Sequence, residues 1–117
     1  ERLHRSRVPI AVVSSSSHSW VDVWLEKLDL ITMTTTVVCR GDAPRIKPAP
    51  DLYHEAVRRL ALSAADCLVI EDSYNGTKAG IDAGCKTLVV PSRLTNCLDF
   101  TIAHGVVDSL TDLLPAE

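Results

Sequence analysis

Residues 68–76, Leu-Val-Ile-Glu-Asp-Ser-Tyr-Asn-Gly, decide the fold, because an apolar run ends there in two adjacent acids. The run at residues 67–71 predicts a buried strand, and Glu71 and Asp72 stand where it stops. In an open parallel sheet, ligands bind at the carboxyl ends of the strands. Clustered negative charge needs a cation or hydrogen-bond donors, and a few hard oxygen ligands suit Mg²⁺. The doublet therefore predicts a Mg²⁺ site; the structural alternative is one helix-capping acid beside one solvated acid.

The rest of the chain alternates between strand-like and helical patterns. Apolar strand-like runs lie at residues 8–13, 34–39, 67–71, 86–90 and, as a small strand, 106–107. Helical segments lie at residues 18–28, 50–60 and 109–114. Ser73, Asn75 and Gly76 favour a turn into a further helix that continues through residues 78–83, and Gly84 ends it as a left-handed cap. Residues 92–104 are a loop or short helix. This alternation predicts an α/β fold: a three-layer, Rossmann-like parallel sheet with helices on both faces.

Composition narrows the class of protein. A chain of 117 residues allows one domain at most, and 46% apolar residues exclude a disordered segment. The apolar runs are too short for a membrane span, and a net charge of −3 with scattered Lys and Arg does not favour nucleic acid. The four cysteines form no close pair, which favours reduced thiols and a cytoplasmic location. Residues 1–7 are basic and resemble the remnant of a preceding helix.

Two further polar signals precede the acidic doublet. Ser14, Ser15 and Ser16 follow the first strand-like run, and Lys47 precedes Pro-Ala-Pro-Asp, whose prolines fix its direction. A serine run is most often a helix cap, and a lysine is usually a solvated charge. Together, a hydroxyl, an ammonium and an acid pair are what phosphoryl transfer needs, because they bind phosphoryl oxygens, neutralise charge and hold Mg²⁺.

Three segments carry a family resemblance: residues 10–16 (Ile-Ala-Val-Val-Ser-Ser-Ser), 45–53 (Arg-Ile-Lys-Pro-Ala-Pro-Asp-Leu-Tyr) and 69–80. They resemble the second, third and fourth motifs of the haloacid dehalogenase (HAD) superfamily of phosphatases and phosphomutases, especially its beta-phosphoglucomutase-like branch. The resemblance implies that Ser14 holds the phosphoryl group, with Ser16 as a fallback, and that Lys47 supports the nucleophile. It implies further roles for four residues after the third strand-like run: Glu71 and Asp72 serve Mg²⁺, and Asn75 and Gly76 shape the loop beneath the metal.

One motif of the family is missing. Its first motif is Asp-x-Asp, which supplies the nucleophile and a general acid and base, and no two aspartates here are two residues apart. The helical cap that selects the substrate is absent as well. The resemblance thus implies a partial HAD-like core domain over residues 1–117. The parent would transfer phosphoryl groups from a small phosphorylated metabolite through an aspartyl-phosphate, and this chain alone would be inactive.

The missing motif also leaves a gap in the sheet. In this family the first-motif strand is central, between the strands that end here at Ser14 and at Glu71. Its absence would leave two unpaired edges, which invite an N-terminal complementing chain, self-association or direct pairing of the two strands. A folded chain with the family's sheet order and a vacant centre is the least expected outcome. The alternative function is a non-catalytic half-domain that binds such a partner chain, or phosphate and Mg²⁺ only.

A receiver domain of two-component signalling uses similar groups around Mg²⁺. Its acid pair comes first along the chain and its lysine last, which is the reverse of the order here. The order therefore disfavours a receiver domain.

Overall fold

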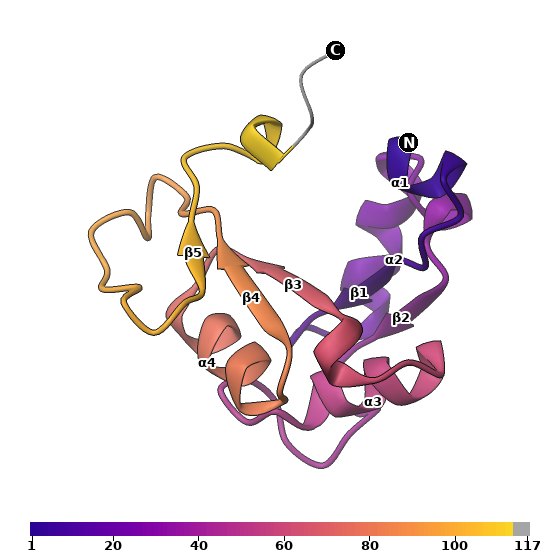
Figure 1. The fold of residues 1–117 in the computed structure, drawn as a ribbon. Helices are drawn as coiled ribbons and strands as arrows, with labels where there is room; N and C mark the ends of the chain where they lie inside the picture. Colours follow the sequence, from indigo (N-terminus) through magenta and orange to yellow (C-terminus); the bar gives the residue numbers. More distant parts are fainter. Residues whose placement is uncertain (114–117) are drawn as a thin grey trace.

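The computed structural model describes residues 1–113 (Figure 1). The strands are β1 (Ala11–Val13), β2 (Thr36–Val38), β3 (Leu68–Glu71), β4 (Lys86–Val89) and β5 (Gly105–Val106). The α-helices are α1 (Arg2–Arg5), α2 (His18–Lys27), α3 (Asp51–Leu60) and α4 (Tyr74–Asp82). Short 3₁₀ helices lie at Ile31–Met33, Ala64–Asp66 and Leu110–Leu113. The order of strands and helices confirms the predicted α/β alternation.

The ends of the elements follow local signals. Ser73 begins α4, and its Oγ accepts a hydrogen bond from the Gly76 amide at 3.1 Å. Gly84 follows α4 with φ +86°, the left-handed conformation predicted for it. Pro50 differs from the prediction, because it precedes α3 as its N-cap instead of forming its first turn. A non-helical loop occupies residues 92–104, and the predicted closing helix is a 3₁₀ helix that ends at Leu113 within the described part of the chain; residue 114 lies outside it.

The strands form two parallel sheets. β1 pairs with β2, with Ala11 opposite Thr36, and β4 pairs with β3 on one side and β5 on the other. Helices α2 and α3 cover opposite faces of the first sheet. On one face Val21 and Leu25 of α2 pack against Cys39, and on the other Leu52 of α3 packs against Val38. The first sheet therefore has the predicted three layers.

The second sheet is covered on one face by α4. Val69 of β3 is buried against Ala79 of α4. Leu68 and Ile70 point the other way and are 54% and 44% exposed. The prediction of a buried strand at residues 67–71 therefore holds for one face of β3 only, because within the described residues no helix packs on its other face. No helix in residues 1–113 is long and apolar enough to cross a membrane.

The two sheets do not join: β1 and β3 face each other without pairing (Figure 1). The expectation that a vacant centre would be the least favoured outcome was wrong, since the structure has that arrangement. Helix α3 gives the physical reason, because it packs on both sheets. Leu52 belongs to the core beneath β1 and β2, and Tyr53 belongs to the core with Val69 of β3. One amphipathic helix thus holds the halves in place across the gap.

Candidate functional site

Lys47 links the carboxyl ends of the two sheets. The loop after β2 returns to this edge, and the Lys47 Nζ donates a hydrogen bond to the carbonyl oxygen of Val13, at the end of β1, at 2.9 Å. The same Nζ forms an ion pair with the carboxylate of Glu71, at the end of β3. The Lys47 and Glu71 side chains are only 11% and 8% exposed. The ammonium therefore lies at the rim where the sequence predicted a site, close to one member of the acid pair.

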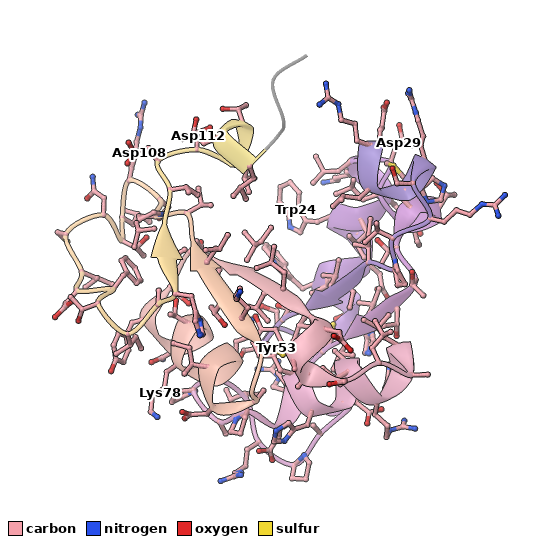
Figure 2. All side chains as sticks on the ribbon, viewed as in Figure 1. Trp24, Asp29, Tyr53, Lys78, Asp108 and Asp112 are labelled. Atoms are coloured by element: carbon pink, nitrogen blue, oxygen red, sulfur yellow. The ribbon has the colours of Figure 1, made fainter. Side chains whose placement is uncertain are left out.

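Tyr53 completes this cluster, and the sequence did not predict it as a site residue. Its hydroxyl donates a hydrogen bond to Glu71 Oε1, and its ring centroid lies 4.8 Å from the Lys47 Nζ. Tyr53, labelled in Figure 2, is buried, with 7% of its surface exposed. Burial, and secondarily the charge of Glu71, raise the pKa of the Tyr53 phenol above its ordinary value. Tyr53 lies six residues after Lys47, in the first turn of α3, and this position could have indicated that its side chain reaches the same site.

Gly76 leaves the space that the Glu71 carboxylate occupies. A Cβ at this position would lie 2.0 Å from Glu71 Oε2, closer than any real contact. Asn75 is exposed, and so is Asp72. In the described part of the chain, Asp72 has no hydrogen bond or ion pair. The acid doublet is therefore divided: Glu71 is engaged by the protein, and Asp72 is open to solvent.

The three serines form a tight turn beside Lys47. The Ser14 Oγ accepts a hydrogen bond from the Ser16 amide at 3.1 Å, and the Ser15 Oγ accepts one from the Lys47 amide at 3.3 Å. The Ser14 amide itself is bonded to the Val38 carbonyl of β2 at 2.9 Å. All three serines are half-buried. The structure thus brings Ser14, Ser15, Ser16 and Lys47 together at one end of the gap between the sheets.

The acids do not form a complete metal site by themselves. Within residues 1–113, no group of three His, Cys, Asp or Glu side chains could hold a metal ion. A groove of about 1150 Å³ lies between β1 and β3, and its lining includes Ser14, Lys47, Glu71 and Asp72. The arrangement therefore offers a cation, hydroxyls and one free carboxylate to a ligand at the end of an open groove.

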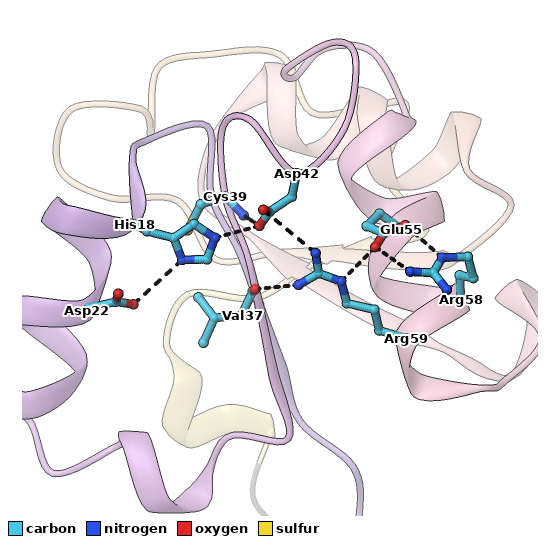
Figure 3. Close-up of polar contacts among 8 residues, drawn as sticks. All are labelled: His18, Asp22, Val37, Cys39, Asp42, Glu55, Arg58 and Arg59. Carbon is cyan, nitrogen blue, oxygen red and sulfur yellow. Dashed lines mark hydrogen bonds and ion pairs between the residues drawn. The ribbon is translucent and has the colours of Figure 1, made fainter.

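A second polar network anchors the loop that carries Lys47 (Figure 3). Asp42 accepts hydrogen bonds from the Cys39 amide at 2.8 Å and from His18 at 2.6 Å, and it pairs with Arg59 of α3 at 3.7 Å. The Cys39 amide, followed by His18, lowers the pKa of the Asp42 carboxyl. Arg59 also pairs with Glu55 at 2.7 Å. The start of α2, the end of β2 and α3 are thereby tied together on the side away from the groove.

Comparisons with known proteins agree with this fold. The family model of haloacid dehalogenase-like hydrolases matches residues 1–90. The bifunctional riboflavin kinase/FMN phosphatase of Arabidopsis thaliana is 38% identical over 113 residues, which cover 91% of this chain and 28% of that protein. Plasmid-encoded CbbY of Cupriavidus necator is 34% identical over 113 residues, which cover 94% of this chain and 44% of CbbY.

A solved structure gives the same result. CbbY from Rhodobacter sphaeroides in complex with phosphate superimposes with a TM-score of 0.90 at 25% identity, covering 95% of this chain and 51% of that one. The chain spans about half or less of the length of the relatives it matches. The matched family model, the curated relatives and the shared fold lead to one conclusion: the chain belongs to the family of haloacid dehalogenase-like hydrolases.

Proposed function

We propose that this chain is the C-terminal part of a single HAD-like core domain. The parent would be a Mg²⁺-dependent phosphatase or phosphomutase that acts on a small phosphorylated metabolite through an aspartyl-phosphate. The observation that carries the proposal is the contact of the Lys47 Nζ with both Val13 and Glu71, because it sets one ammonium between the carboxyl ends of β1 and β3. A flavin mononucleotide phosphatase and a phosphate-bound CbbY among its relatives support a phosphorylated ligand.

The serine turn and Lys47 would bind the phosphoryl group. The Ser14 hydroxyl would donate to a phosphoryl oxygen, with Ser15 and Ser16 beside it, and Lys47 would neutralise the charge that develops during transfer. Hydrogen bonds from the Ser16 amide to Ser14 Oγ and from the Lys47 amide to Ser15 Oγ hold these two hydroxyls at the end of β1. Glu71 would act as a positioning residue, since it holds the ammonium together with Tyr53.

The donor set fits Mg²⁺ in part. Mg²⁺ is usually held by one or two carboxylates, with water and phosphate oxygens completing its shell. Asp72 is exposed and has no partner in the described part of the chain, so its carboxylate is the natural ligand, whereas Glu71 is already engaged by Lys47 and Tyr53. Asn75 and Gly76 would shape the loop beneath the ion. When bound, Mg²⁺ would offset the negative charge of the phosphoryl oxygens.

The nucleophile would come from outside these residues, because the sequence contains no Asp-x-Asp. The test is phosphate release from 4-nitrophenyl phosphate in the presence of Mg²⁺. We expect little or no turnover from the isolated chain. The contradicting result is robust turnover that disappears in Lys47→Ala and persists in the surface variant Lys78→Ala. It would show that a carboxylate within the chain attacks phosphorus, and that the nucleophile does not come from outside these residues.

A second candidate function is favoured by the groove between β1 and β3. A non-catalytic half-domain that binds a complementing chain, or phosphate and Mg²⁺ only, would present this open edge to its partner. Both candidates share the same ligand-binding rim, and they differ in whether a nucleophile is ever supplied.

A further inference from the structure

We propose that the sulfur atoms of Cys67 and Cys85 form a two-coordinate site for one soft univalent metal ion, of which Cu⁺ is the type. The site lies at the amino ends of β3 and β4, because each cysteine immediately precedes its strand. The ion pair of Lys47 and Glu71 lies at the carboxyl end of β3. The inference therefore concerns a second site and does not depend on the proposed phosphatase function.

The register of the second sheet sets the two cysteines side by side. Val69 of β3 pairs with Thr87 of β4, and both side chains are buried on the face that α4 covers. Side chains two residues apart on a strand share a face. Cys67 and Cys85 stand two residues before Val69 and Thr87, so they lie opposite each other on that same face. Both accordingly belong to one core cluster, and all four cysteines of the chain are free thiols.

The spacing of the strands suits a bridging ion. Neighbouring strands lie about 4.7–4.9 Å apart. The bond between zinc and a thiolate, about 2.3 Å long, gives the scale of a metal–sulfur bond, so two such bonds in line span roughly 4.6 Å. A disulfide would instead draw the two sulfur atoms to about 2 Å. An ion held between two sulfur atoms on adjacent strands therefore fits the sheet without movement of the backbone.

The surroundings of the two thiols select the kind of ion. The core cluster that contains them includes the apolar side chains of Ala64, Val69, Ala79 and Ala83. Over residues 1–113, no third His, Cys, Asp or Glu side chain joins the pair to form a larger metal-binding group. Structural zinc takes four ligands, so it does not suit this pair. Thiolate ligands select soft ions such as Cu⁺, which the two sulfur atoms can hold alone.

Binding exchanges two protons for the ion. Burial raises the pKa of both thiols, and the neighbouring Cys67 raises that of Cys85 further, so both start protonated at neutral pH. The ion enters past Cys67, which is half-buried, whereas Cys85 is 2% exposed. Two metal–sulfur bonds form, both S–H bonds break, and the two protons pass to water. Cys67 also gives up its hydrogen bond to the Ser63 carbonyl at 3.3 Å. The ion keeps its oxidation state, and its affinity falls as pH falls.

The test is an anaerobic titration of the full, reduced 117-residue chain with Cu⁺, supplied as its acetonitrile complex, followed by competition with bicinchoninate. We expect one ion per chain, weaker binding at pH 6 than at pH 8, and two sulfur neighbours in X-ray absorption at the copper edge. Cys67→Ala and Cys85→Ala should each weaken binding by at least roughly tenfold. The matched controls Cys39→Ala, in the other core, and Cys97→Ala, at the surface, should leave it within about twofold.

Three results would overturn the proposal. Unchanged binding in Cys67→Ala would place the ion elsewhere, and no binding at all would mean that the pair is not a site. One ion per two chains, lost in Cys97→Ala and accompanied by a dimer in sedimentation, would assign the ion to the exposed thiols of two copies. If Cys85→Ala proves unfolded by circular dichroism, the half-buried Cys67→Ala still decides the question. None of these measurements involves phosphate, so a failure here is distinguishable from failure of the proposed phosphatase function.

Discussion

The ammonium of Lys47 and the carboxylate of Glu71 form an ion pair between residues 24 positions apart, with each side chain about nine-tenths buried. A charge removed from water must be compensated, and here each compensates the other. The Tyr53 hydroxyl and the Val13 carbonyl complete the hydrogen bonding of the pair. The pair therefore connects the two sheets at the rim where the ligand would bind.

Removal of the Lys47 charge should destabilise the fold. In Lys47→Met the Glu71 carboxylate stays buried without its partner, which costs roughly 3–5 kcal/mol in such pairs. The control is Lys78→Met, because Lys78 pairs with Asp82 at the surface, where side chains 45% and 41% exposed contribute about 0–1 kcal/mol. Urea denaturation measures both free energies of unfolding. Equal losses in the two variants would show that the Lys47–Glu71 pair is not a buried link.

Gly76→Ala should lower stability although alanine favours helices. Within α4 the substitution gains about 1 kcal/mol of helix propensity. Its Cβ would meet the Glu71 carboxylate at 2.0 Å, and the displaced carboxylate would lose Lys47, so we expect a net loss of about 1–3 kcal/mol. At Gly105 the nearest atom is the end of the flexible Leu88 side chain at 2.8 Å, so Gly105→Ala should change stability by about 0.5 kcal/mol or less. Thermal unfolding of both variants measures the two losses of stability. A larger loss in Gly105→Ala than in Gly76→Ala would contradict the prediction.

Acid should destabilise the chain through Asp42. Hydrogen bonds from the Cys39 amide and His18 lower the pKa of this carboxyl in the folded state, so the unfolded chain binds its proton first. The contribution is fully present above the unfolded pKa of about 4 and is lost as pH falls through the lower, folded pKa. Free energies of unfolding measured between pH 6 and pH 2 should therefore fall less steeply in Asp42→Asn. Identical slopes in the wild type and in Asp42→Asn would contradict the assignment.

Mg²⁺ should bind weakly and through Asp72. Two carboxylates and water make a thin shell, and Glu71 is engaged by the protein, so Asp72→Asn should abolish binding in a calorimetric titration. Glu71→Gln should weaken it less, because Glu71 acts through the position of Lys47. Asp108→Asn is the control for loss of one negative charge. Unchanged binding in both doublet variants would exclude this rim as the metal site.

The sequence predicted the strands and the rim of the site because local signals specify them. Apolar runs fix the strands, Ser73 and Gly84 bound α4, and the prolines after Lys47 fix its direction. The sequence did not predict that Glu71 would be buried and paired while the neighbouring Asp72 is exposed. Their environments depend on Gly76 and Tyr53, whose contacts with Glu71 exist only in the folded chain.

The vacant centre of the sheet could not be predicted from edge pairing alone. An unpaired edge is unfavourable, yet β1 and β3 remain unpaired, and α3 contributes to the cores beneath both. Leu52 and Tyr53 are adjacent in sequence, yet they enter two different cores. Helical periodicity predicts one apolar face for α3 and does not show that this face is shared between two sheets.

The measurement that tests the central claim most directly is an NMR titration of the ¹⁵N-labelled chain with inorganic phosphate in the presence of Mg²⁺. We expect saturable shifts at the amides of Ser14, Ser15, Ser16 and Lys47, extending to Asp72. We expect these shifts to disappear in Lys47→Met and to persist in Lys78→Met. Shifts confined to other surfaces, or an unchanged response in Lys47→Met, would contradict a phosphate site built on the serine turn and the Lys47 ammonium.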